Sequence, residues 1–195
     1  MYYLKRLFTT ADVKGTEKYL DTQKKYELIR TLLYFGISAS LFIGGYLQTK
    51  SKVNLLTIVA VLGCLPASKS AVNAIMFFRF KSCKPENAAE IKAHSEGLLT
   101  LFDCIFTSYS KTYRVSHLAV RGRTVCGFTE DPNFDETEFN KHITDILKLD
   151  GHKDVTVKIF TSLSRYTERL EQMKALEENE TASTAIIETL KSVIL

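Results

Sequence analysis

Four side chains in the second half of the chain are of the types that thiol chemistry needs. Cys104, His117 and Cys126 fall on three neighbouring segments with β-strand composition, and Asp103 precedes the first cysteine. A thiol activated by an imidazole base is a nucleophile, and a carboxylate can orient that base. Asp103 and Cys104 are adjacent on a strand, however, and therefore face opposite sides. Because cysteines on apolar strands are usually small core residues, we expect structural roles here.

A run of acids, Glu130, Asp131, Asp135, Glu136 and Glu138, could bind a cation. It lacks the Asp-x-Asp-x-Asp-Gly spacing of a calcium loop. Three of the acids fall in the first turn of a predicted helix, where the helix dipole favours negative charge. The four cysteines form no CxxC or Cys/His pattern with zinc spacing. The sequence therefore predicts no metal site and no cofactor.

Nucleotide and hydrolase motifs are also missing from the sequence, which has no Walker loop, GxGxxG, GxSxG or HExxH. The charge is uneven along the chain. Residues 1–80 hold eleven basic and four acidic groups, and residues 81–195 hold fifteen and eighteen. The basic excess lies beside the apolar runs described below, where anionic lipid attracts it. We therefore expect anionic headgroups, and no nucleic acid, as partners of this part.

Residues 81–195 are expected to fold as an α+β domain. The predicted order is one helix, a three-strand meander, a helix, a strand and two helices. Asp135 is the expected N-cap of the helix that stops at Gly151. The strands are expected at residues 101–109, 115–121, 124–130 and 154–160.

This order of elements resembles the restriction-endonuclease-like fold. In that fold an aspartate on the second strand and a Glu-x-Lys on the third hold a metal. Here the matching second strand has Ser116 before His117, and the third reads Val125-Cys126-Gly127-Phe128-Thr129. The resemblance covers about 75 residues and rests on the order of the helices and strands alone. It implies that fold without its active site.

Two apolar runs precede this domain. Residues 31–48 carry no charge, residues 53–78 carry only Lys69, and residues 49–52 join them. An uncharged run of about 18 residues can cross a bilayer as a helix. The alternative is a buried helical pair in a soluble core, but the first run is apolar all round. We predict a transmembrane hairpin with an external tip at 49–52, after a basic lead-in at 1–30.

Basic residues predict the orientation of this hairpin. Residues 1–30 hold seven Lys or Arg, and Arg79, Lys81, Lys84 and Lys92 follow the second run. Positive flanks stay in the cytoplasm. We therefore expect a multi-pass protein of the cell membrane with both termini cytosolic, and an uncleaved first span. Its first eight residues, MYYLKRLF, read either as an interfacial stretch or as a frayed terminus.

Three basic side chains are expected at the membrane interface: Arg30, Lys69 and Arg79. Arg30 lies 21 residues before Ser51 at the tip, and Lys69 lies 18 after it. At about 1.5 Å per residue these are similar depths. Lys69 is therefore predicted to extend its ammonium into the headgroups. A buried functional lysine is the alternative.

Small residues recur every four positions in both runs. Such stripes let two helix backbones approach closely. We expect the stripes to pack the two helices against each other, with self-association between copies as the alternative. The stripes are Gly36, Ser40 and Gly44 in the first run, and Ala60, Cys64 and Ser68 in the second.

These patterns predict an anchored interaction or assembly module that binds a protein partner. An enzyme acting at the cytosolic face through unassigned Cys, His or Asp groups is one alternative, and an accessory subunit of a transport complex is another. The last helix bears on this choice, because Ala185, Ile186, Leu190 and Val193 form one apolar stripe. We expect this stripe to pack in its own domain, and docking of a partner is the alternative.

Overall fold

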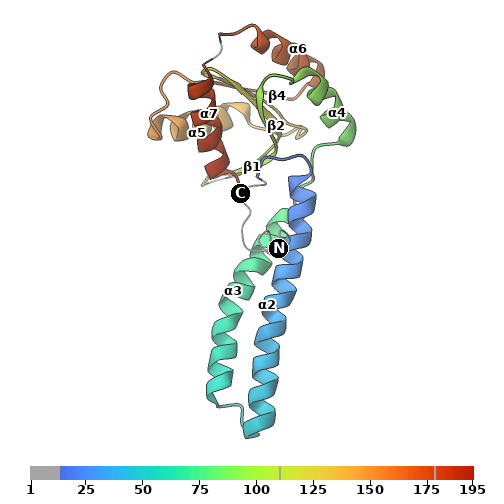
Figure 1. The fold of residues 1–195 in the computed structure, drawn as a ribbon, viewed down its shortest axis with the longest axis vertical. Coiled ribbons are helices and arrows are strands. Elements are labelled where there is room, and N and C mark those ends of the chain that lie inside the picture. The colour runs from blue at the N-terminus through green and yellow to red at the C-terminus, as the bar shows by residue number, and fades with distance from the viewer. Residues whose placement is uncertain (1–13, 110, 178) are drawn as a thin grey trace. The chain divides into compact units, whose positions relative to one another are not determined.

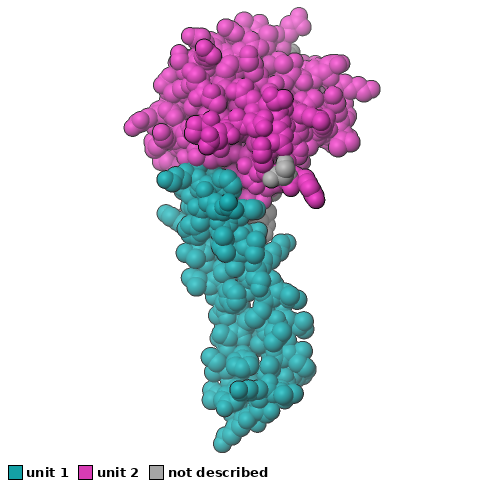
Figure 2. Space-filling view, turned by 180° about the vertical axis from the view of Figure 1, so that it is seen from behind, with its two compact units in different colours: residues 1–10, 20–81 teal, residues 11–19, 82–195 magenta. Residues whose placement is uncertain are grey.

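The computed structural model describes residues 14–109, 111–177 and 179–195. The chain divides into two compact units, which Figure 2 colours separately. One contains residues 20–81, and the other contains residues 14–19 together with the described residues from 82 onward. The expected interfacial or frayed stretch at residues 1–8 lies outside the described residues.

Two long antiparallel helices form the first unit (Figure 1). Helix α2 spans Tyr19–Thr49, and α3 spans Leu55–Phe78. The Asn54 side chain caps α3 by accepting a hydrogen bond from the Thr57 backbone N–H at 2.8 Å. Both helices are long and apolar enough to cross a membrane. Only 11% and 17% of their most apolar 18-residue windows are buried, so these helices expose most of their apolar side chains.

A four-stranded mixed sheet forms the centre of the second unit, with strand order β1-β2-β3-β4. The first three strands pair antiparallel as a meander, and β4 pairs parallel with β3. The helix α5 connects β3 to β4 along the chain. The α+β prediction is therefore confirmed. The elements are β1 (Leu99–Thr107), β2 (Thr112–Arg121), β3 (Thr124–Phe128), α5 (Glu136–Leu149) and β4 (Thr156–Phe160).

Helices cover both faces of this sheet, giving three layers (Figure 1). On one face lie α5 and α7 (Glu180–Val193), which bury Phe139, Ile143 and Leu190 among others. On the other lie α4 (Pro85–His94) and α6 (Leu163–Lys174). The predicted stripe of the last helix packs in its own domain, since Ile186 and Leu190 are fully buried. Burial of two apolar layers is the main source of stability for such a domain.

The sheet changes its alternation in the middle of β1. Leu101 faces the layer of α5 and α7, and so does Cys104, although strict alternation would place Asp103 there. Asp103 has a left-handed backbone with φ of 53°. Its Oδ1 accepts a hydrogen bond from the Cys83 backbone N–H at 2.7 Å, next to α4. One left-handed residue therefore moves the apolar positions of the strand by one.

The outer edge of β1 is closed by the two ends of the described chain. The Phe102 N–H donates to the Gly15 carbonyl at 2.7 Å, and the Leu195 N–H donates to the Ile105 carbonyl at 3.0 Å. The Lys14 ammonium donates to the Ile194 carbonyl. An edge strand with unpaired backbone groups can join another chain. Here these segments satisfy part of that edge.

Candidate functional site

The four predicted catalytic side chains are all buried. Asp103, His117 and Cys126 lie on the side of the sheet that α4 and α6 cover, and Cys104 lies on the other side. Asp103 is 1% exposed, and Cys104, His117 and Cys126 are fully buried. Cys104 lies in the layer of α5 and α7, and Cys126 lies in the layer of α4 and α6. The sheet therefore separates the two thiols. Asp103 and its neighbour Cys104 face opposite sides of the sheet, as the sequence predicts.

His117 is bonded inside the layer of α4 and α6. Its Nδ1 lies 2.6 Å from the Tyr166 hydroxyl oxygen, and its ring packs edge-on against Phe102 at 4.3 Å between centroids. Burial lowers the pKa of His117 to about 3. A general base works best with a pKa near the working pH. The imidazole is therefore neutral and an inefficient base at pH 7.

The cysteines also lie in environments that keep them as thiols. Burial is the main cause that raises the pKa of Cys104 and of Cys126. The pKa of Cys83 is raised to about 12 by burial and by the charges of Glu130 and Asp103. The thiolate is the nucleophilic form of cysteine. These surroundings do not favour thiol catalysis, and the thiol-and-base site stays a prediction.

Glu130, from the acidic run, belongs to a network that sequence reasoning missed. Its carboxylate pairs with the Arg114 guanidinium. It also accepts hydrogen bonds from the Lys84 backbone N–H at 3.0 Å and from Asn87 Nδ2 at 2.6 Å. The network joins the segment before α4 to β2 and to the end of β3. Glu130 is partly buried, with 10% of its side chain exposed, and its hydrogen bonds and ion pair indicate a structural role.

Asp135, a second residue of the acidic run, caps α5 as predicted. Its Oδ1 accepts a hydrogen bond from the Glu138 backbone N–H at 3.0 Å. This bond and the Lys111 ammonium lower the pKa of Asp135. Within the part of the chain that the structure describes, no three His, Cys, Asp or Glu side chains are grouped as metal ligands.

The contact between α2 and α3 uses small residues at a different spacing from the predicted stripes. A Cβ added at Gly45 would lie 2.8 Å from Leu56 Cβ, and one at Gly63 would lie 2.7 Å from Ser38 Oγ. Ala60 is buried, Cys64 is half-buried and Ser68 is exposed. The positions that are not exposed between residues 31 and 49 of α2 are Thr31, Tyr34, Ser38, Leu41 and Gly45.

The other predicted stripe lies away from this contact. Gly36, Ser40 and Gly44 are exposed, and an added Cβ at either glycine would meet no atom within 4 Å. The hairpin contact therefore follows a spacing of three and four residues in alternation, typical of left-handed helix pairs. A role of the exposed stripe in self-association stays a prediction.

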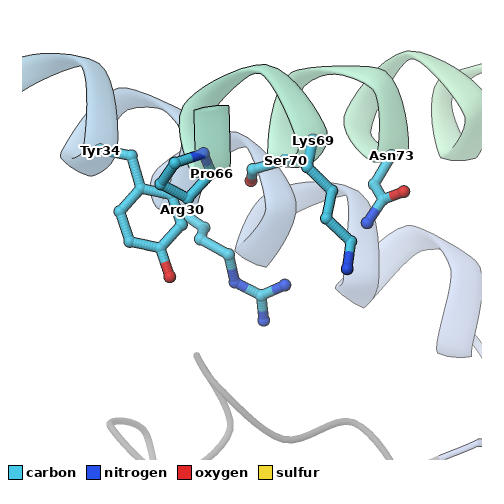
Figure 3. Close-up of a pocket in the computed structure, with 6 residues that line it drawn as sticks. All are labelled: Arg30, Tyr34, Pro66, Lys69, Ser70 and Asn73. Carbon is cyan, nitrogen blue, oxygen red and sulfur yellow. The ribbon is translucent and has the colours of Figure 1, made fainter. Parts of the chain in front are cut away.

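Arg30 and Lys69, two of the three predicted interface residues, line one pocket of the hairpin with Tyr34, Ser70 and Asn73. Figure 3 shows the guanidinium, the ammonium, the Asn73 amide and the Tyr34 hydroxyl pointing to the same side of the helix pair. The cavity measures about 190 Å³, and Pro66 completes its lining. The third interface residue, Arg79, is the exposed C-cap of α3.

A buried acid supports this pocket. Glu27 is 2% exposed, and its Oε1 lies 2.7 Å from Arg30 Nη1. Gln23 Nε2 donates to the same carboxylate at 3.1 Å, and the Ser70 hydroxyl donates at 3.3 Å. Thr31 Oγ1 in turn lies 3.0 Å from Ser70 Oγ. The acid therefore orients the arginine and links α2 to α3.

Sequence reasoning found the two cations but not their polar partners. Glu27, Thr31 and Tyr34 lie three or four residues apart, in register with the small positions Ser38 and Gly45. This spacing is visible in the sequence once the helix is extended before residue 31. The predicted stripes lie within the two apolar runs, whereas Glu27 precedes the first run.

Comparisons with known proteins find no match: no family model, no curated protein and no solved structure matches the chain. The likeness to the restriction-endonuclease-like fold therefore stays a prediction from element order.

Proposed function

We propose that this protein is an integral membrane protein whose α+β domain is an anchored interaction or assembly module. The observation that carries the membrane part is the exposed surface of α2 and α3. Leu32, Leu47 and Leu65 are each at least 65% exposed, and many other apolar side chains of both helices are exposed with them. Contiguous apolar surface of this extent is unfavourable in water and favourable in lipid.

Alkaline carbonate extraction of membranes tests this part. Peripheral proteins are released by the treatment, and integral proteins stay in the sedimented membranes. We expect the full chain to stay there and to enter solution only with detergent. Release by carbonate alone would contradict the proposal.

Both termini are proposed to lie in the cytosol. The support comes from the basic residues at the open end of the hairpin, among them Lys24, Lys25 and Arg79, which outnumber Lys50 and Lys52 at the tip. A reporter that is active only outside the cytoplasm, fused after Leu195, should give no signal. The same reporter inserted between the tip lysines should be active. The reverse pattern would overturn the orientation.

The α+β domain is proposed to bind a protein partner rather than to catalyse a reaction. Support comes from the filled core: the Cys and His groups considered for chemistry are buried and their ionisation is suppressed. The exposed large apolar side chains of the described domain are few: Leu99, Tyr109, Leu149 and Leu176. We therefore expect a polar, partly charged binding surface instead of an apolar groove.

Crosslinking in intact membranes tests the module. The full chain is compared with a chain that ends at Lys81 and keeps only the hairpin. We expect a specific crosslinked partner with the full chain alone. A partner captured equally by both chains would place the binding on the hairpin and contradict the proposal.

We also propose the restriction-endonuclease-like fold for the domain, without its chemistry. Support comes from the order helix, three strands, helix, strand, with β4 parallel to β3. Ser116 and the stretch at residues 125–129 stand where that fold carries metal ligands. An absence of magnesium-dependent DNA cleavage by the purified chain is the expected result.

A further inference from the structure

The pocket of Arg30, Tyr34, Lys69, Ser70 and Asn73 is placed at one end of the hairpin. Thr31 lies opposite Ser70, and Gly45 lies opposite Leu56, so the two helices share one register from end to end. Arg30 precedes Lys50 at the tip by 20 residues, which is about 30 Å of helix. The hydrocarbon core of a bilayer is about 30 Å thick. With the tip at one headgroup layer, the pocket therefore lies at the other.

The groups that line the pocket are those that bind phosphate. A guanidinium forms paired hydrogen bonds with phosphate oxygens, and an ammonium adds a point charge. Arg30 and Lys69 supply these two cations from two different helices. The Tyr34 hydroxyl and the Asn73 amide point to the same side and add donors (Figure 3). Two cations with converging neutral donors distinguish this pocket from a single interfacial lysine.

Glu27 sets the charge and the geometry of the pocket. Its carboxylate pairs with Arg30 at 2.7 Å and is itself buried, so it neutralises one of the two cations. The Lys69 ammonium adds a positive charge beside this ion pair, and a phosphodiester carries one negative charge. Because Glu27 is bonded to Gln23 and Ser70, the guanidinium is held in place before any ligand arrives. Such preorganisation lowers the entropy cost of binding.

The pocket is small and open on one side. Sites for drug-sized molecules usually measure about 300–1,000 Å³. This pocket of about 190 Å³ has room for a headgroup phosphate, and its open side leaves space for the rest of a lipid. Basic pockets between membrane helices are known sites for lipid headgroups.

We propose that this pocket binds the headgroup phosphate of one anionic phospholipid. The inference rests on the proposed membrane location of the hairpin. Anionic lipid is favoured over phosphatidylcholine, since the choline ammonium would meet Arg30 and Lys69 at close range. The pocket thereby goes beyond a general attraction of basic flanks to a membrane, because it binds one lipid at a defined place.

Native mass spectrometry of the full-length protein in mild detergent tests the proposal. The protein is titrated with phosphatidylglycerol and, separately, with phosphatidylcholine. We expect one phosphatidylglycerol to bind at least tenfold more tightly than phosphatidylcholine. Arg30→Gln with Lys69→Gln should abolish this preference. The matched control removes two lysines at the tip, Lys50→Gln with Lys52→Gln, and should keep it.

Two further measurements distinguish a lipid site from a site for soluble phosphate, and paired hydrogen bonds from charge alone. Inorganic phosphate is added to the wild-type complex: failure to displace the lipid supports a lipid site, and ready displacement would assign the pocket to a soluble phosphate instead. Arg30→Lys keeps the charge but loses the paired hydrogen bonds, so its lipid preference should fall between those of the wild type and the double variant. Equal preference in the double variant and the wild type would overturn the proposal.

Membrane integration is measured on the same variants by carbonate extraction. Release of the wild-type protein by carbonate would mean that the proposed function fails. Integration of all variants without any lipid preference would overturn the lipid site alone. Thermal melting in detergent identifies a variant that fails to fold, and Arg30→Lys then serves as the test of the pocket.

Discussion

In the α+β domain, the Nδ1 atom of His117 lies 2.6 Å from the hydroxyl oxygen of Tyr166, and both side chains are fully buried. The two residues are 49 positions apart, on β2 and α6. A neutral imidazole and a phenol can share one hydrogen bond without burying a charge. The pair therefore links α6 to the sheet. Its contribution to the free energy of unfolding depends on whether His117 is protonated, because a buried imidazolium is unfavourable.

The first prediction concerns pH. Because the folded pKa of His117 is about 3 and an unfolded histidine has a pKa of about 6.5, the unfolded chain binds one more proton between these values. The contribution of His117 to stability is complete above pH 6.5. It is lost by about 1.4 kcal/mol for each pH unit below that, down to about pH 3. Unfolding by urea in detergent at pH 7.5, 6 and 5 measures this loss.

His117→Gln is the comparison for this pH dependence. Glutamine does not titrate, and the neighbouring Tyr166 stays neutral because burial raises its pKa. We expect the variant to be less stable than the wild type at pH 7.5. Between about pH 3 and 6.5 its free energy of unfolding should fall less steeply with decreasing pH, because one proton fewer is taken up on unfolding. Parallel pH profiles of the two proteins would show that His117 has the same pKa in the folded and unfolded chain, which would contradict the prediction.

The second prediction concerns the hairpin. Gly45→Leu should lower the melting temperature in detergent, because a side chain at Gly45 would collide with Leu56 Cβ. The adjacent variant Gly44→Leu should melt like the wild type, because an added Cβ there meets no atom within 4 Å. A larger effect at Gly44 than at Gly45 would place the contact on the predicted stripe after all, or reveal packing between copies.

Glu130 provides a third prediction. Glu130→Ala removes the partner of Arg114 and the acceptor of the Lys84 N–H and of Asn87. We expect a loss of about 3 kcal/mol in the free energy of unfolding, because the remaining guanidinium is partly buried without its counter-ion. Glu168→Ala, at an exposed position of α6, should change it by less than about 0.5 kcal/mol. Similar losses in the two variants would argue against the network.

The last helix is the subject of the fourth prediction. Leu190→Ala should cost about 2–5 kcal/mol, since Leu190 is fully buried in the layer of α5 and α7. Truncation after Glu180 should abolish cooperative unfolding of the domain. Glu188→Ala, on the exposed side of α7, serves as the control. A truncated chain that still unfolds cooperatively would show that α7 is dispensable for the fold.

Patterns that depend on near neighbours could be predicted from the sequence. The apolar runs indicated α2 and α3, the turn at Gly122 indicated the β2–β3 hairpin, and Asp135 indicated the start of α5. Each rests on periodicity or capping within a few residues. The connection from β3 through α5 to β4 followed from the same local signals.

Features that depend on long-range contacts could not be predicted. The left-handed backbone of Asp103 shifts the alternation of β1, and no local signal requires it. The register of α2 against α3 depends on Thr31 and Ser70 meeting across the hairpin, a contact that the predicted stripe of Gly36, Ser40 and Gly44 does not contain. Glu130 lies in a run of acids in the sequence, whereas its partners lie on β2 and before α4, far from it along the chain.

The pairing of β1 with both ends of the described chain affects the order in which the two units fold during translation. The Gly15 carbonyl and the Leu195 N–H bond the same strand, and Lys14 reaches the Ile194 carbonyl across a separation of 180 residues. During synthesis the hairpin, whose contacts are local, can form while the sheet is still being translated. The part of the edge that pairs with residues 194 and 195 stays open until residue 195 has left the ribosome. The proposed membrane insertion of the hairpin would then precede completion of the domain, and a stalled chain would present the unpaired part of the β1 edge to other proteins.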